Sequence, residues 1–365
     1  MKFEVRNSVI RPAIATASTV IGRAMLPILN NVRLDLRGGL LTITGSNIEQ
    51  TVSTTIEVNG IESGSATVPA KKLLALLGSI QPEVTIRMEC DEEKSHCNLT
   101  AGSGKFKLLG LPADDFPMPD TSDANALHYI MDGATLGRMI REVRPAAAVN
   151  EARVVMNGIA FEFMDDHEFN TIATDGKRMA ISNSMGRSDT CEEKKMFILP
   201  VNAVAPISRI TGDFIHIMVK EKTAMFTDQN TSVITKLIEG NYPNYRAVCP
   251  TTAKYYADAN AEICRGLIGM IATVAGDDDV ISLEFSENKI LFRAESAATG
   301  SGSDAVACDC NCTEPMEIRL KAGYLRDAIA DSEEIVSFRF NSPGHPVEVA
   351  RRNGSKTIIM PVRIK

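Results

Sequence analysis

The sequence predicts an α+β fold in which a β-rich domain with two helices occurs three times. Short apolar strands that lead into helices begin at residues 3, 129 and 255, a spacing of 126 residues both times. Each helix is followed by a strand with period-two alternation, at 31–36, 158–163 and 280–285, and the fifth residue of each strand is acidic. Pro-containing stretches at 116–117 and 242–243 are also 126 residues apart.

The remaining elements follow in the same order in every repeat. The first helices are expected at 8–21, 135–148 and 261–274. The strands after the first turn are expected at 40–44, 171–174 and 289–293. The second helices are expected at 70–80, 201–210 and 321–331. The closing hairpin strands are expected at 84–88 and 105–109, 215–219 and 233–238, and 336–340 and 356–360. We therefore predict three domains, with limits 1–121, 122–250 and 251–365.

Composition indicates a globular protein without a membrane segment. The 365 residues are 44% hydrophobic but include no Trp, so the cores are expected to be aliphatic. The N-terminus has no apolar signal-peptide region, and no run is long and apolar enough to span a membrane. With eight cysteines and no secretion signal, we expect reduced thiols and a cytoplasmic location.

Charge is unevenly distributed along the chain. The net charge is −7, which argues against a generally basic DNA-coating surface. The six predicted helices, however, hold ten Lys and Arg but only four Asp and Glu, which leaves 29 basic and 42 acidic residues elsewhere. Arg138, Arg141 and Arg144 recur every three residues and can share one helical face. The helices can therefore present a positive face to a phosphate backbone, although solvated faces with internal ion pairs remain an alternative.

No catalytic motif is complete. The segment 102–106 lacks the first Gly and the Ser or Thr of a phosphate-binding loop, and no strand–GxGxxG–helix unit occurs. Cys308, Cys310 and Cys312 alternate without a second ligand pair, so ordinary strand thiols are favoured over a zinc site. Asp277, Asp278 and Asp279 are expected in a solvated turn. None of the five histidines lies in a nucleophile context. We predict no enzyme activity, no cofactor and no metal.

Several motifs together resemble the bacterial sliding clamp, the beta subunit of DNA polymerase III. They are the opening 1–3, Leu-Pro-Ile-Leu-Asn-Asn at 26–31, Val-Pro-Ala-Lys-Lys at 68–72, 111–117, Ala-Thr-Asp-Gly-Lys-Arg-Met-Ala at 173–180, Tyr-Pro-Asn-Tyr-Arg at 242–246 and Met-Pro-Val-Arg-Ile at 360–364. The resemblance covers the whole chain. It implies a DNA clamp fold, in which two chains form a head-to-tail dimeric ring of six domains with helices lining the hole.

The resemblance also implies a function that involves no catalysis. Such a ring encircles double-stranded DNA through phosphate contacts without reading its sequence, and it tethers a polymerase at the primer end. The implied partners are DNA polymerase subunits, the clamp loader and a second copy of the chain. The DNA-contacting residues, from the resemblance and from the helix charge, are Arg23, Lys71, Arg138, Arg141, Asn150, Arg153 and Arg209.

A partner-peptide pocket is implied between the second and third domains. Its Met and aliphatic walls suit varied peptides, with Arg178 and Arg363 as polar anchors, although simple core packing is the alternative for the Met residues. The implied residues are Met156, Thr174, Gly176, Lys177, Arg178, Met179, Pro243, Val248, Gly344, Pro346, Ile359, Met360, Pro361, Val362 and Arg363. Ala247 stands where relatives often carry Arg, so the peptide preference is expected to differ.

The dimer contact is implied between edge strands of domains one and three. Its residues are Lys105, Phe106, Leu108, Thr273 and Val274. Relatives carry an acidic cluster here, whereas this chain has a run of small residues at 296–303, which we expect to be flexible. We hypothesise that the ring opens more readily than in relatives. A tight dimer in sedimentation at low micromolar concentration would contradict this.

Two other functions fit part of the sequence. A metal-dependent nuclease that uses the Asp277–279 cluster would show divalent-metal-dependent turnover. A scaffold that kept the fold but lost the ring would be monomeric and would not be retained on circular DNA.

Overall fold

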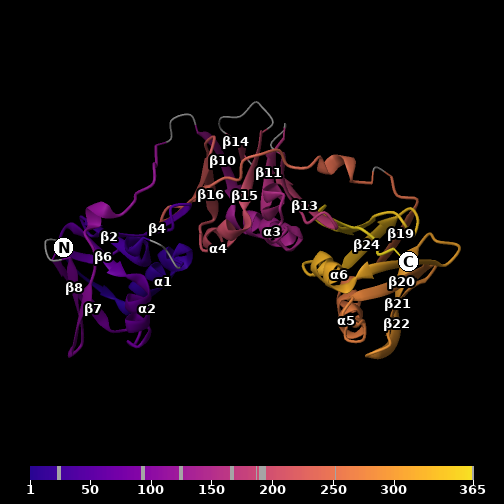
Figure 1. The fold of residues 1–365 in the computed structure, drawn as a ribbon, viewed down its shortest axis with the longest axis horizontal. Helices are drawn as coiled ribbons and strands as arrows, with labels where there is room; N and C mark the ends of the chain where they lie inside the picture. Colours follow the sequence, from indigo (N-terminus) through magenta and orange to yellow (C-terminus); the bar gives the residue numbers. More distant parts are fainter. Residues whose placement is uncertain are drawn as a thin grey trace. The chain divides into compact units, whose positions relative to one another are not determined.

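The computed structural model describes residues 1–22, 26–91, 95–122, 126–164, 168–185, 187–188, 195–250 and 252–363. The chain forms two compact units: the first comprises Met1–Ala134, Gly186–Cys191 and Asn202–Leu237, and the second Thr135–Met185, Glu192–Val201 and Ile238–Lys365. The middle repeat is therefore divided between the units. Figure 1 shows the order of the elements along the chain.

The first unit contains two antiparallel sheets within the described residues. The five-stranded sheet has the order β5-β1-β7-β8-β9, with β1 Lys2–Arg6, β5 Asn59–Glu62, β7 Thr85–Asp91, β8 His96–Ala101 and β9 Gly104–Leu109. The nine-stranded sheet has the order β14-β10-β16-β17-β18-β4-β3-β2-β6, with β14 Arg187–Ser188, β10 Leu127–Asp132, β16 Phe214–Val219, β17 Thr223–Thr227, β18 Thr231–Lys236, β4 Gln50–Glu57, β3 Leu40–Ser46, β2 Asn31–Arg37 and β6 Gly64–Pro69.

The second unit contains one twelve-stranded arrangement within the described residues. Its order is β15-β11-β12-β13-β26-β25-β24-β19-β22-β21-β20-β23. These strands are β15 Lys195–Pro200, β11 Gly158–Phe163, β12 Glu168–Thr174, β13 Arg178–Met185, β26 Lys356–Ile359, β25 Val347–Arg351, β24 Ile335–Phe340, β19 Tyr255–Asn260, β22 Gly300–Cys310, β21 Lys289–Ser296, β20 Val280–Ser286 and β23 Met316–Lys321.

The helices cover the sheets with narrow apolar faces. In α1 (Asn7–Ala17), Ile10, Ile14 and Ala17 are fully buried at the spacing of one helical face. The other helices are α2 Ala70–Gly78, α3 Gly133–Val143, α4 Val204–Ile207, α5 Ala261–Ala272 and α6 Ala322–Ile329. The pairs α1–α2 and α5–α6 pack against each other, as Figure 1 shows. Helix α5 has a side-chain cap, where Asn260 accepts a hydrogen bond from the Ile263 amide.

The helix predictions were right in position but too long. The first helices end in short 3-10 turns, at Ser18–Val20 and Arg144–Ala146, so Arg144 lies outside α3. The predicted helix 201–210 is reduced to the four residues of α4 after a 3-10 turn. Pro206 removes one backbone donor there, which weakens a longer helix. The run 296–303, predicted to be flexible, instead forms the end of β21, a turn and the start of β22.

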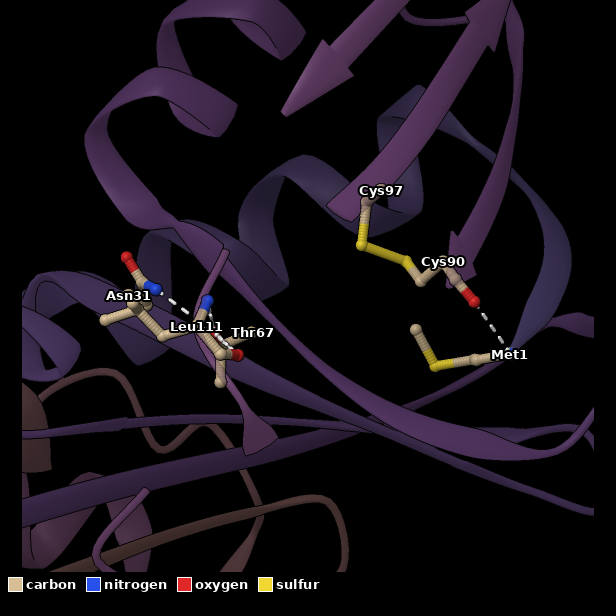
Figure 2. The surroundings of a disulfide bond; sticks show 6 residues. All are labelled: Met1, Asn31, Thr67, Cys90, Cys97 and Leu111. Atoms are coloured by element: carbon tan, nitrogen blue, oxygen red, sulfur yellow. Dashed lines mark hydrogen bonds between the residues drawn. A yellow bond between two sulfur atoms is a disulfide. The ribbon is translucent and has the colours of Figure 1, made fainter. Parts of the chain in front are cut away.

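The prediction of reduced thiols is wrong for one pair. Cys90 in β7 and Cys97 in β8 are joined by a disulfide, shown in Figure 2. Cys308, Cys310 and Cys312, predicted to be ordinary strand thiols, are free, and so is Cys264; Cys312 lies just after β22. Burial raises the pKa of Cys264 to about 12 and that of Cys308 to about 11, so both are poor nucleophiles.

Candidate functional site

A tight turn between β12 and β13 organises the predicted pocket. The Thr174 hydroxyl donates to the Arg178 carbonyl at 2.7 Å, and the Gly176 amide donates to the Thr174 hydroxyl at 3.1 Å. The amides of Lys177 and Arg178 both donate to the Asp175 carboxylate at 2.9 Å. Gly176 has φ +82°, a conformation that favours glycine. The Thr-Asp-Gly-Lys-Arg motif is therefore the set of residues that this turn needs.

Arg178 fastens the turn to neighbouring elements. Its guanidinium donates to Asp175 at 3.2 Å and to Asp327 of α6 at 2.6 Å, and also to the Pro145 carbonyl. The guanidinium carbon lies 4.3 Å from the ring centre of Tyr324, a cation–π contact. The Arg178 side chain is only 12% exposed. The predicted peptide anchor thus has a structural role in this chain, with most of its donor groups directed inward.

The C-terminal strand lies beside this turn. Strand β26 pairs with β13, so that Arg178 is opposite Ile359, and the Met360 amide donates to the Lys177 carbonyl at 3.0 Å. Met360 is 42% exposed. The methyl end of Met156 lies next to Gly176, about 3.4 Å from where a Cβ would be. Residues from three distant parts of the chain therefore meet here, as the resemblance implied.

The linker after β18 packs onto the same region. Tyr245 and Met179 belong to a small buried cluster with Ala160, Ile172, Ile181 and Ile358, and Tyr242 packs against it. Burial raises the pKa of the Tyr242 hydroxyl, which therefore stays protonated. Pro243 is half-buried and Val248 is 50% exposed. The linker thus carries the exposed apolar side chain of Val248 three residues after Tyr245, which is buried with Met179.

A separate cavity of about 870 Å³ holds the rest of the predicted pocket. Of the predicted residues it is lined by Gly344, Pro361, Val362 and Arg363. Val362 is held by a hydrogen bond from its amide to the Arg319 carbonyl at 2.9 Å. The other lining residues, which the sequence did not indicate, are Tyr255, Thr313, Glu314, Pro315, Met316, Glu317, Arg319 and Pro343. Pro346 is half-buried and does not line this cavity.

The predicted DNA-contacting residues differ in their exposure and in the contacts that their side chains make. Lys71, Arg141, Asn150, Arg153 and Arg209 are exposed. Asn150 has φ +56°, in the left-handed region that Asn tolerates. Arg23 lies outside the described residues.

Arg138 differs from this group because it neutralises a buried acid. It pairs with Glu142 at 3.0 Å, and the Glu142 side chain is 0% exposed. Glu142 also accepts hydrogen bonds from Ser182 and, at 2.8 Å, from Asn353. An internal ion pair, the alternative considered for helix charges, therefore accounts for Arg138.

The predicted dimer residues lie on or beside sheet edges. Lys105, Phe106 and Leu108 belong to β9, and Phe106 is 42% exposed. Thr273 and Val274 follow α5, and the Val274 side chain lies about 3.2 Å from a Cβ placed on Gly302 of β22. The Thr299 hydroxyl donates to the Val274 carbonyl at 2.9 Å.

The described residues contain no group of three or more His, Cys, Asp or Glu arranged to hold a metal ion. Asp279, from the cluster considered for a nuclease, instead accepts the Gly323 amide at 2.8 Å at the start of α6. None of the helices in the described ranges has the length and apolarity needed for a membrane span.

The topology and these motifs define a three-domain DNA clamp fold. Over its full length the chain is similar to the DNA polymerase III beta subunit from Pseudomonas aeruginosa, with a TM-score of 0.91, 23% identity and complete coverage of both chains. It is also similar to the beta subunit from Thermotoga maritima, with a TM-score of 0.89, 19% identity and complete coverage of both chains.

Models of the DNA polymerase III beta subunit match nearly the whole chain. The N-terminal domain matches residues 1–120, the central domain 131–244 and the C-terminal domain 246–363. The beta sliding clamps of Escherichia coli and Pseudomonas putida are 26% and 24% identical, and the alignments cover all of this chain and of each relative. The chain belongs to the DNA polymerase III beta subunit family. It is a DNA sliding clamp, a processivity factor and not an enzyme.

Proposed function

We propose that two copies of this chain join head to tail into a ring of six domains around duplex DNA, with the helices facing the hole. The domain limits in this proposal are 1–121, 122–250 and 251–365. The proposal rests on strand pairing between successive repeats. This pairing occurs twice within the chain, and among the described strands it leaves one edge in the first repeat and one in the last repeat without a partner.

The two internal junctions use equivalent strands. In the first unit, the start of β4 pairs with β18, with Gln50 opposite Thr235 and Thr54 opposite Thr231. In the second unit, the start of β13 pairs with β26, with Arg178 opposite Ile359 and Ile181 opposite Lys356. In both, the fourth strand of one repeat receives the last strand of the next repeat.

In the first and last repeats, the equivalent strands each have an edge without a partner among the described strands. Strand β9, the last strand of the first repeat, pairs only with β8 among the described strands. The start of β22, the equivalent of β4 and β13, pairs only with β21 in the described chain. At these positions β4 and β13 are largely buried, whereas the first five residues of β22 are mostly exposed. A second copy that supplies β9 to β22 would cover both edges and close the ring.

Charge supports the placement of DNA inside the ring. The exposed Lys71, Arg141 and Arg209 lie on or next to helices, while the chain as a whole is acidic. Helices that face the hole would attract phosphates without reading bases, so that the ring can slide. An acidic exterior would disfavour binding of DNA outside the ring.

An edge substitution tests ring closure. Phe106→Asp places a charge on the free edge of β9 and is expected to give a monomer in sedimentation velocity at low micromolar concentration. The matched control is Phe214→Asp, an aromatic that is 63% exposed, against 42% for Phe106, on β16, a strand that already has partners on both sides. The control is expected to stay dimeric. A dimeric Phe106→Asp protein, or a monomeric wild type, would refute the proposed ring.

We further propose that polymerase subunits and the clamp loader insert short peptide motifs where the β12–β13 turn, the linker and the C-terminal strand meet. Exposed Met360 on the C-terminal segment and exposed Val248 on the linker, with Met179 buried on β13, provide adaptable apolar surface there. Sliding clamps from Pseudomonas aeruginosa and Bartonella birtlesii have been solved bound to griselimycin, which serves as a probe. Met360→Glu is expected to weaken griselimycin binding in calorimetry by at least about tenfold. Met185→Glu, an exposed Met outside the pocket, is the control, and equal affinity of both variants would reject this pocket.

A further inference from the structure

We propose that the Cys90–Cys97 pair is a reversible redox site that controls how firmly the free edge of the first repeat is held. Its consequence for ring opening rests on the ring proposed above. Within this inference, the disulfide makes the clamp ring longer-lived, and its reduction by a dithiol makes the ring exchange subunits faster.

The two cysteines lie directly opposite each other on neighbouring strands. Cys90 of β7 is opposite Cys97 of β8, and both face the core, with exposures of 6% and 1%. The start of the chain is fastened at the same point: the Met1 amino group donates to the Cys90 carbonyl at 3.1 Å, and the Cys90 amide donates to the Met1 carbonyl at 2.9 Å. Figure 2 shows the disulfide and the first of these bonds. The bond therefore joins β8 to the residue of β7 that is hydrogen-bonded to the start of the chain.

Strand β8 is the only described strand that pairs with β9, the free edge. Cys97 is opposite Leu108 of β9, and Leu99 is opposite Phe106. Leu108 packs against the same buried core as both cysteines. Any loosening of β8 therefore moves β9, the strand that the proposed ring presents to the second copy.

The chemistry balances with a dithiol as reductant. Its two thiols supply two electrons and two protons, the Cys90–Cys97 bond breaks to two thiols, and the dithiol becomes a disulfide. The two cysteines are seven residues apart in the sequence, so the bond limits how far β7 and β8 can separate when the hairpin opens. The reverse step needs a disulfide as oxidant: it accepts two electrons and two protons as the Cys90 and Cys97 thiols join, and becomes a dithiol. The bond therefore forms and breaks with the balance of disulfide and dithiol around the protein. Because both sulfurs are buried, the reductant must wait for local opening of the hairpin.

The experiment compares oxidised and reduced full-length protein. Alkylation without reductant, followed by peptide mapping, is expected to find Cys90 and Cys97 bonded in air-oxidised protein and as thiols after dithiothreitol. Subunit exchange between fluorescently labelled copies is expected to be about tenfold faster after reduction, a change that corresponds to about 1.4 kcal/mol. The Cys90→Ser/Cys97→Ser variant should exchange as fast as reduced wild type and should not respond to dithiothreitol. Cys308→Ser, which removes a free thiol, should respond as wild type does.

Separate outcomes refute the redox site and the ring. Two unbonded thiols in oxidised protein, or equal exchange rates before and after reduction, would refute the redox site. A protein that is monomeric in both states would refute the ring. In that case amide hydrogen exchange still tests the redox site: reduction must speed exchange in β8 and β9 but not in β20 and β21. Unchanged exchange in β8 and β9 would overturn the inference even if the doubly substituted variant failed to fold.

Discussion

The sequence pattern located several arginines but did not give the role of each one. Arg138 and Arg141 recur on one helix and were predicted to contact DNA together. Arg138, whose side chain is 29% exposed, forms an ion pair with the fully buried Glu142, while Arg141 is exposed. Arg178 likewise holds Asp175 and Asp327. Glu142 and Asp175 are near their arginines in the sequence, whereas Asp327 is far from Arg178 along the chain. The sequence identified the arginine positions, but the burial of Glu142 and the contact with Asp327 depend on tertiary structure.

Removing the two arginines should have different effects. Arg138→Ala leaves Glu142 charged and buried, so it is expected to lower the free energy of unfolding by about 3–5 kcal/mol. Arg141→Ala is expected to change it by less than about 0.5 kcal/mol and to reduce the salt dependence of DNA binding by about one unit of slope. Urea denaturation and binding titrations at several salt concentrations measure both effects. Equal destabilisation by the two substitutions would contradict the assignment.

Asp35 gives a prediction about pH. Burial raises the pKa of Asp35, but hydrogen bonds from Arg33 and Ser65 and the Arg33 charge outweigh this, so the pKa is lowered overall. A lowered folded-state pKa contributes stability above the unfolded value of about 3.9, and this stability is lost as pH falls through the folded pKa. Asp35→Asn is therefore expected to flatten the loss of stability in acid. Parallel acid-denaturation curves for the two proteins would rule this out.

At the scale of elements, periodicity predicted most strands and helices, but not their ends. The three repeats appear in order because alternating strands and amphipathic helices leave local signals. The contraction of α4 and the ordering of 296–303 depended on Pro206 and on pairing with β21, which periodicity does not encode. The Cys90–Cys97 bond depended on the register of β7 and β8, so cysteine spacing alone did not reveal it.

Two glycines differ in the space around them: Gly45 of β3 packs against helix α1, and Gly266 lies on an open face of helix α5. A Cβ on Gly45 of β3 would lie about 2.0 Å from the Ala17 carbonyl oxygen of α1, whereas a Cβ on Gly266 of α5 meets nothing within 4 Å. Gly45→Ala is expected to destabilise by at least about 1–3 kcal/mol. Gly266→Ala is expected to stabilise by about 0.5–1 kcal/mol through helix propensity. Thermal unfolding of both variants measures this, and the same sign for both would show that the α1–β3 packing is wrongly described.

At the scale of the whole molecule, the chain contains two completed junctions and the two edges of a third. The pairings β4–β18 and β13–β26 show how one repeat receives the next. Among the described strands, β9 pairs only with β8 and the start of β22 only with β21. Strand β9 corresponds to β18 and β26, and β22 corresponds to β4 and β13. The sequence resemblance implied a ring, and the repeated pairing supports the ring proposed above.

Retention on DNA tests the central claim most directly. The full-length protein is assembled on nicked circular DNA with a clamp loader and ATP, and retention is measured before and after the circle is cut to a linear molecule. A topological ring predicts retention on the circle and rapid loss from the linear form, with Phe106→Asp retained on neither. Equal retention of the wild-type protein on circular and linear DNA would mean ordinary affinity for phosphates and would contradict the ring.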